Sequence, residues 1–132
     1  MSDKQKVFDL QFTDKQLGQL KEHLERLDQQ LSEVVSMRKA LEDFKELDGN
    51  EELKVPITNG IFASAKLTNS KKVEVNVGSG IVVNKTIDEA IELIGSQLSQ
   101  MAQYREQVLE QFNQIIQKAE QLAKDLQEED HV

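Results

Sequence analysis

The chain has 132 residues, a length that allows one domain of ordinary size. It has no cysteine, which excludes disulfide bonds, thiol chemistry and zinc sites built on cysteine. Its 24 acidic and 16 basic residues give a formal net charge of −8, so no basic surface for nucleic acid is expected. No apolar run reaches the roughly 18 residues of a membrane span, and the N-terminal residues lack the apolar region of a signal peptide. We therefore expect a soluble, cytoplasmic protein without a membrane partner.

The first part of the chain, residues 1–50, has the heptad pattern of a coiled coil. Apolar residues recur at alternating intervals of three and four, at Leu17, Leu20, Leu24, Leu27, Leu31 and Val34, and the same phase continues through Arg38 to Leu41. Polar and charged residues fill most positions between them. The pattern predicts a helix from about Thr13 to a Gly-containing terminator at residues 48–50, a length of about 50 Å.

The last part, residues 87–132, repeats this pattern over a longer stretch. Thr86 and Glu89 have the spacing of a capping box, which predicts where the helix begins. The seam then passes through Ile87, Ile91, Ile94, Leu98, Met101, Val108, Phe112, Ile115, Ala119, Leu122 and Leu126. A second helix of about 60 Å is expected.

Between the helices, in residues 51–86, the apolar period changes to two, which is typical of strands. Asn59-Gly60 lies between two such runs and predicts a hairpin with a type I′ turn, in which both turn residues have positive φ. A second hairpin is predicted with its turn at residues 78–80. Pro56 cannot donate a ladder hydrogen bond, so the first strand should lie at an edge or at a strand start.

The expected fold is α+β: a long antiparallel two-helix coiled coil with two β-hairpins inserted at the bend. Isolated hairpins are marginal in water and their open edges invite pairing. We therefore expect strands from other subunits to complete the sheet. The apolar residues expected to form this subunit-assembly surface are Val55, Ile57, Ile61, Phe62, Leu67, Val73, Val75, Val77, Ile81 and Val83.

The distribution of charge supports this division into shafts and insert. Residues 51–86 hold five basic and three acidic residues, whereas residues 87–132 hold three and ten. Residues 1–50 hold eight basic and eleven acidic residues. The helices are thus acidic and solvated, while the insert is nearly neutral, as an assembly surface would be.

The insert LKVPITNGIFASAKLTNSKKVEVNVGSGIVVNKTIDEA between two heptad helices resembles the alpha class of prefoldin subunits. The most specific matches are Val55-Pro56-Ile57, the run from Val75 to Gly80, and Lys85-Thr86 at the entry to the second helix. Two hairpins rather than one separate the alpha class from the beta class in that family. The resemblance covers essentially the whole chain, residues 1–132, as a single subunit.

The resemblance implies a hexamer of two alpha and four beta subunits whose hairpins form intersubunit β-barrels. It further implies a chaperone that holds unfolded polypeptides at the tips of its coiled coils and delivers them to a group II chaperonin. No ATP and no cofactor are needed for this activity. The alternative is a structural coiled-coil scaffold that only oligomerises through its hairpins.

The expected client-binding residues lie at the open end of the coiled coil. They are Val7, Phe8, Leu10 and Phe12, which precede the regular heptads, together with Leu122 and Leu126 near the other terminus. Unfolded chains offer scattered apolar side chains, so an exposed apolar patch can bind them. In the alternative interpretation these residues extend the seam and close the tip.

Catalytic and metal sites find little support. His23 and His131 are the only histidines and fit solvated surface positions, and the carboxylates are spread along helix exteriors. Arg38 and Arg105 occupy seam positions where apolar residues are expected. Their stems should pack while their guanidinium groups reach acidic neighbours, or else they loosen the shaft locally. The sequence therefore predicts a binding protein and not an enzyme.

Overall fold

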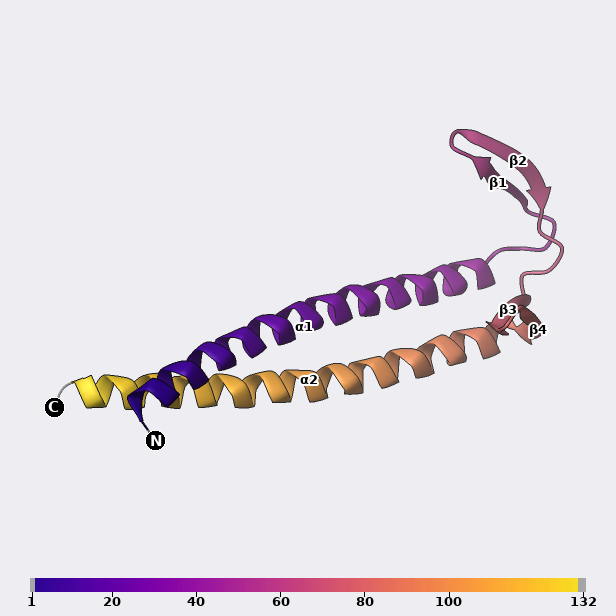
Figure 1. Cartoon of the computed structure of the whole chain (residues 1–132). Coiled ribbons are helices and arrows are strands. Elements are labelled where there is room, and N and C mark those ends of the chain that lie inside the picture. The colour runs from indigo at the N-terminus through magenta and orange to yellow at the C-terminus, as the bar shows by residue number, and fades with distance from the viewer. Residues whose placement is uncertain (1, 131–132) are drawn as a thin grey trace. The chain divides into compact units, whose positions relative to one another are not determined.

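The computed structural model describes residues 2–130, and the side chains of residues 2–128. Two long helices flank two hairpins, in the order α1 (Asp3–Lys45), β1 (Glu52–Thr58), β2 (Ile61–Lys66), β3 (Lys72–Gly78), β4 (Ile81–Thr86) and α2 (Ile87–Asp130) (Figure 1). This confirms the predicted α+β class. The chain divides into two compact units: unit 1 contains the residues up to Ser32 and from Ser99 onward, and unit 2 contains residues 33–98.

Helix α1 begins ten residues before the predicted start at Thr13, so that prediction is wrong. The hydroxyl of Ser2 accepts a hydrogen bond from the backbone N–H of Gln5 at 3.3 Å, which caps the helix. The residues from Val7 to Phe12 do not follow the heptad spacing, but no proline or glycine interrupts them. A capped segment without helix breakers continues the helix even where its apolar pattern is irregular.

Helix α2 begins where the capping box predicts. The backbone N–H of Glu89 donates to the Thr86 hydroxyl at 3.1 Å, and the backbone N–H of Thr86 donates to the Glu89 carboxylate at 3.4 Å. Two backbone donors that have no partner inside the helix are thereby satisfied.

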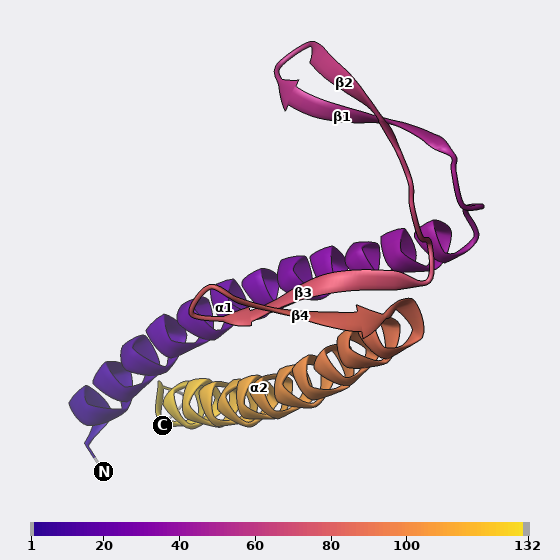
Figure 2. The same ribbon diagram turned by 90° about the vertical axis from the view of Figure 1, so that its right-hand side faces the viewer.

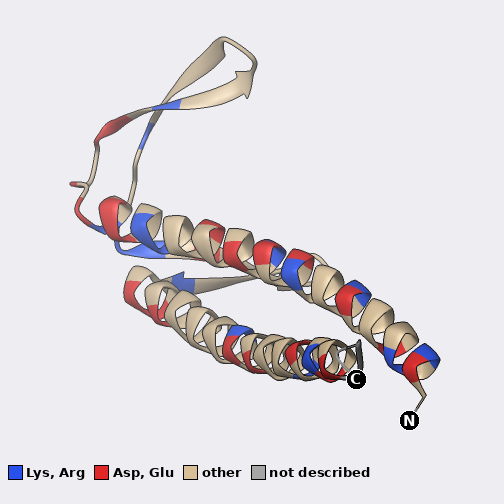
Figure 3. Cartoon of the chain, turned by 90° about the vertical axis from the view of Figure 1, so that its left-hand side faces the viewer, with Lys and Arg blue, Asp and Glu red and all other residues tan. Residues whose placement is uncertain are grey.

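In unit 1 the two helices are antiparallel and meet along the predicted seam. Its core consists of Leu24 and Leu27 from α1 and Val108 from α2, and the half-buried side chains packed against it are Leu20, Leu109 and Phe112. Charged residues recur along both helices (Figure 3), and few residues of α1 are buried. The buried seam is therefore narrow, as in a two-stranded coiled coil.

The two hairpins are separate antiparallel two-stranded sheets, and each is visibly twisted (Figure 2). In the first, the register shifts between Pro56 and Thr58, and Gly60 has a φ of 77°. Asn59 does not adopt a positive φ, so the predicted type I′ turn is wrong. The irregularity beside the turn, with one glycine in the left-handed region, is the pattern of a bulged hairpin loop, which needs only one positive φ.

The second hairpin has the turn conformation that was expected in the first. Ser79 and Gly80 have φ values of 52° and 75°, two consecutive positive values as in a type I′ turn. Gly78 has a φ of 118°, and its N–H donates to the side-chain oxygen of Asn76 at 2.9 Å. Gly78 and Gly80 adopt their positive φ values without a steric cost, whereas Ser79 has a Cβ and adopts the left-handed region at some cost.

One residue of the linker between the hairpins ties the helix ends together in unit 2. The Lys71 carbonyl accepts a hydrogen bond from the backbone N–H of Ile87 at 2.8 Å, and the Lys71 ammonium donates to the Lys45 carbonyl at 2.8 Å. The Lys45 ammonium in turn pairs with Asp88 at 2.6 Å. The end of α1 and the start of α2 are thus joined through polar contacts at the root of the second hairpin.

Candidate functional site

The hairpins expose most of their apolar side chains. Of the predicted assembly residues, Leu67, Val73 and Val75 are half-buried and the others are exposed, Ile57 to 68%. No charged residue lies between Val55 and Ala65 or between Val75 and Asn84, and the outer part of the first hairpin is accordingly free of red and blue (Figure 3). Contiguous apolar surface of this kind marks an interaction site in a folded protein.

Both faces of each hairpin are apolar. Side chains of consecutive strand residues point to opposite faces. Val82 and Val83 are consecutive and both exposed, as are Ile61 and Phe62. Val82, which is not in the predicted assembly set, therefore belongs to this exposed apolar surface as well. A two-stranded sheet with apolar residues on both faces and open edges on both sides needs partners in more than one direction.

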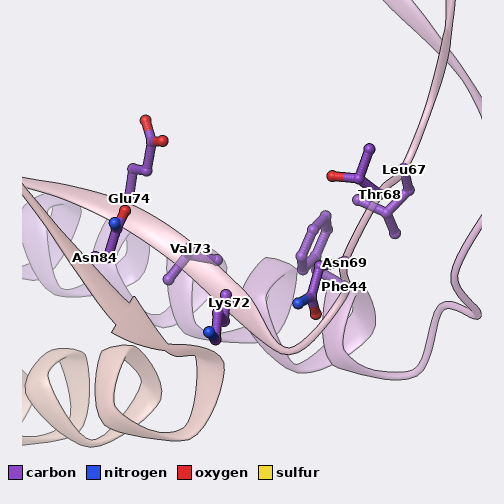
Figure 4. A pocket seen from close by; sticks show the side chains of 8 residues that line it. All are labelled: Phe44, Leu67, Thr68, Asn69, Lys72, Val73, Glu74 and Asn84. Atoms are coloured by element: carbon purple, nitrogen blue, oxygen red, sulfur yellow. The ribbon is translucent and has the colours of Figure 1, made fainter.

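A groove follows strand β3 in unit 2. Its volume is about 570 Å³, and it is lined by Phe44, Leu67, Thr68, Asn69, Lys72, Val73, Glu74 and Asn84 (Figure 4). A second groove of about 400 Å³ shares two of these residues and is lined by Met37, Ala40, Leu41, Phe44 and Val73.

The heptad analysis missed this second groove, because Met37 and Ala40 lie off the predicted seam. The i, i+3, i+4, i+7 spacing from Met37 to Phe44 was the available signal for a second apolar stripe on α1. The helix therefore offers an apolar face to strand β3 in addition to its seam.

The predicted client-binding residues lie in unit 1, where the described ends of α1 and α2 lie together (Figure 1). Phe8 and Phe12 are 67% and 54% exposed, and Val7 is also exposed. Leu10 and Leu126 are half-buried, and Leu122 is buried. Thr13 is fully buried, with its hydroxyl donating to the Asp9 carbonyl at 2.6 Å. The exposed apolar surface at this end therefore comes mainly from the first turns of α1.

A hydrogen bond and an ion pair link the two helices of unit 1. The Nε2 atom of His23 lies 3.0 Å from the Tyr104 hydroxyl, with the rings edge to face. His23 is thus half-buried and has a partner, although the sequence suggested a solvated position. His131 lies outside the described residues. The Arg105 guanidinium hydrogen-bonds both carboxylate oxygens of Asp28, with its Nε donating at 2.5 Å.

Carboxylate partners raise the pKa of two cations. The hydrogen bond to Asp28 raises the pKa of Arg105, and the hydrogen bond to Asp88 raises the pKa of Lys45. Both groups are cationic at neutral pH, as their ion pairs with Asp28 and Asp88 require. Arg38 pairs with Glu42 on its own helix at 3.2 Å. Both seam arginines therefore reach acidic neighbours, as the first interpretation expects.

Two other kinds of site are absent from the described part of the chain. Among residues 2–128, no three or more His, Cys, Asp or Glu side chains are grouped so that they could hold a metal ion. Neither of the described helices contains an apolar stretch of the length that a membrane span requires.

Comparison with known proteins identifies the family. The model of the family described as Prefoldin subunit matches residues 13–130. Prefoldin subunit alpha of Archaeoglobus fulgidus is 27% identical over 122 residues, covering 92% of this chain and 89% of the relative. That of Methanobrevibacter smithii is 33% identical over 117 residues, covering 83% and 80%. The cryo-EM structure of filamentous PFD from Methanocaldococcus jannaschii has the same fold, with a TM-score of 0.75 at 21% identity, covering 87% of this chain and 95% of that one. The chain belongs to the prefoldin family and is similar to its alpha subunits.

Proposed function

We propose that this chain is the alpha subunit of an ATP-independent holdase, which binds unfolded polypeptides at the ends of its coiled-coil arms. Membership of the prefoldin family makes it a chaperone subunit. The main support for this location of the binding site is the exposure of Phe8 and Phe12 at the start of α1. Delivery of the client to a group II chaperonin and a cytoplasmic location complete the proposal.

Such a site binds weakly at each arm and strongly through many arms. An unfolded polypeptide has no fixed shape, so a shallow apolar patch suits it better than a pocket. Linked weak contacts raise the overall affinity well above that of a single contact. A hexamer of two alpha and four beta subunits presents six arms, so one unfolded polypeptide can contact several arms at once.

The hairpin surfaces support the assembly part of the proposal. Prefoldin alpha subunits form oligomeric complexes with other prefoldin subunits. Here, residues 51–86 expose apolar side chains on both faces of two small sheets with open edges. Strands of neighbouring subunits would cover these faces and pair with these edges in an intersubunit β-barrel. Residues 1–50 and 87–132 would then serve as the arms.

The binding site is tested by changing Phe8, Phe12 and Leu126 to serine together. The hexamer formed with the beta subunit should remain intact, because these residues lie outside the hairpins. Protection of a denatured client against aggregation, followed by light scattering, should fall sharply because the exposed apolar surface is lost. Charge reversal at the exposed Glu22 and Glu106 is the matched control and should leave protection unchanged.

Normal protection by the triple variant would move the client site away from the arm ends. A hexamer that forms normally but never suppresses aggregation, even with the unchanged chain, would instead favour the scaffold function. The exposed hairpins fit a structural scaffold equally well, because a scaffold needs only an assembly surface and no client-binding surface. Mass measurement of the complex accompanies each assay, so that loss of assembly is not mistaken for loss of client binding.

A further inference from the structure

Unit 1 has a groove on its side, between the two helices. Its volume is about 370 Å³, and it is lined by Gln16, Gln19, Leu20 and His23 of α1 and by Gln111 and Ile115 of α2. We call it the arm groove. Its two aliphatic side chains are half-buried, whereas Gln19 and Gln111 are exposed.

The arm groove continues the surface of the exposed phenylalanines. Residues 8, 12, 16, 19 and 23 follow one another at intervals of four, four, three and four, which places them on one face of α1. This stripe is Phe8, Phe12, Gln16, Gln19 and His23, and it has no acidic residue, lysine or arginine in a helix that is otherwise densely charged. The stripe thus begins with two apolar residues and reaches the groove without a charged residue in between.

The groove has the chemistry to bind a polypeptide main chain. Each glutamine amide offers both a donor and an acceptor, the same pair of functions that every peptide unit offers. Among the side chains of residues 2–128, none forms a hydrogen bond with the side-chain amides of Gln16, Gln19 and Gln111. Leu20 and Ile115 add an apolar lining for client side chains.

We propose that the arm groove binds an extended segment of the client, whose apolar side chains contact Phe8 and Phe12 and whose main chain contacts the glutamine amides. This inference rests on the proposed holdase function and specifies how the arm recognises its client. From residue 8 to residue 23 the stripe spans about 22 Å, since a helix rises 1.5 Å per residue. An extended chain of about seven residues covers that distance.

The inner end of the groove is closed by contacts between the helices. His23 and Tyr104 meet there at 3.0 Å. Arg105, the next residue of α2, pairs with Asp28 of α1. The stripe also ends here, because Arg26 takes the next position on this face of α1. The client segment therefore extends inward from the phenylalanines only as far as this bridge.

The absence of cysteine from the chain allows a direct test. Gln19→Cys places one thiol in the groove, and Lys21→Cys places one on the opposite, exposed face of the same helix. The hexamer that contains each variant is labelled with a maleimide, with and without a guanidine-denatured, cysteine-free client. The client should slow labelling of the residue 19 thiol severalfold and leave the residue 21 thiol unaffected.

If the client leaves the labelling rate at residue 19 unchanged and is still held in solution, client binding in the arm groove is wrong, whereas the holdase function is not contradicted. Failure of the hexamer to hold any client overturns both. As a second measurement, Gln19→Ala with Gln111→Ala should weaken client binding by about two- to tenfold for each amide, the change expected for one neutral hydrogen bond. Undiminished client affinity in this double variant contradicts main-chain recognition.

Discussion

At the scale of single residues, the arginines in the seam show how a charged side chain is accommodated in a coiled coil. Arg105 is less exposed than its partner Asp28, and it forms two hydrogen bonds to that carboxylate across the helices. Exposed ion pairs contribute little to stability on average. The packing of the aliphatic stem and the position in the seam therefore matter more than the charge.

We expect Arg105→Leu to raise the melting temperature of the helices by several degrees, because an apolar residue at a seam position packs better than a guanidinium stem. Arg105→Ala should lower it, because the stem contacts are lost. Circular dichroism of the assembled complex during heating measures both changes. A lower melting temperature for the leucine variant would show that the bond to Asp28 stabilises the arm more than seam packing does.

At the scale of elements, local chemistry predicted some features and missed others. The start of α2 was predictable because the capping box depends only on Thr86 and Glu89, three residues apart. The turn of the first hairpin was not, because a bulge between Pro56 and Thr58 relaxes the requirement for two positive φ values. The start of α1 was missed because the residues before Thr13 lack heptad spacing and yet continue the helix.

Two glycines should respond oppositely to the same substitution. Gly80 has a φ of 75°, so Gly80→Ala should destabilise the β3–β4 hairpin by about 1–2 kcal/mol. Gly95 lies within α2, and a Cβ added there would meet nothing within 4 Å besides its chain neighbours and the backbone of its own helix, so Gly95→Ala should stabilise the helix by about 1 kcal/mol. Amide hydrogen exchange of each element measures the change, and equal effects of the two substitutions would contradict the backbone argument.

At the scale of the whole molecule, the sequence shows which residues are apolar but does not show what covers them. Heptads indicated that Leu24, Leu27 and Val108 are core residues, and they are buried within one chain. The exposed hairpin residues have no such cover within the described chain, and in the function proposed above other subunits provide it. The arm groove was missed for a different reason: it is lined largely by glutamines, which no hydrophobic pattern singles out.

The role of the hairpins is tested by deleting Glu52 to Lys85 and joining the helices through a short Gly/Ser turn. The helical signal in circular dichroism should largely persist, because the seam of unit 1 is retained. The hexamer should be lost, because its strands are gone. Sedimentation of the variant with its partner subunit provides the measurement, and a hexamer that still forms would place the assembly surface on the helices.

The contact between His23 and Tyr104 also has an optical consequence. The chain contains one tyrosine and no tryptophan. Its tyrosine and tryptophan fluorescence, measured on the isolated chain, therefore comes from a single ring. That ring lies edge to face with an imidazole of the opposite helix, with 5.7 Å between the ring centroids. Separation of the helices at this level changes the surroundings of the only such fluorophore. The arm thus carries an intrinsic, label-free reporter of its own opening.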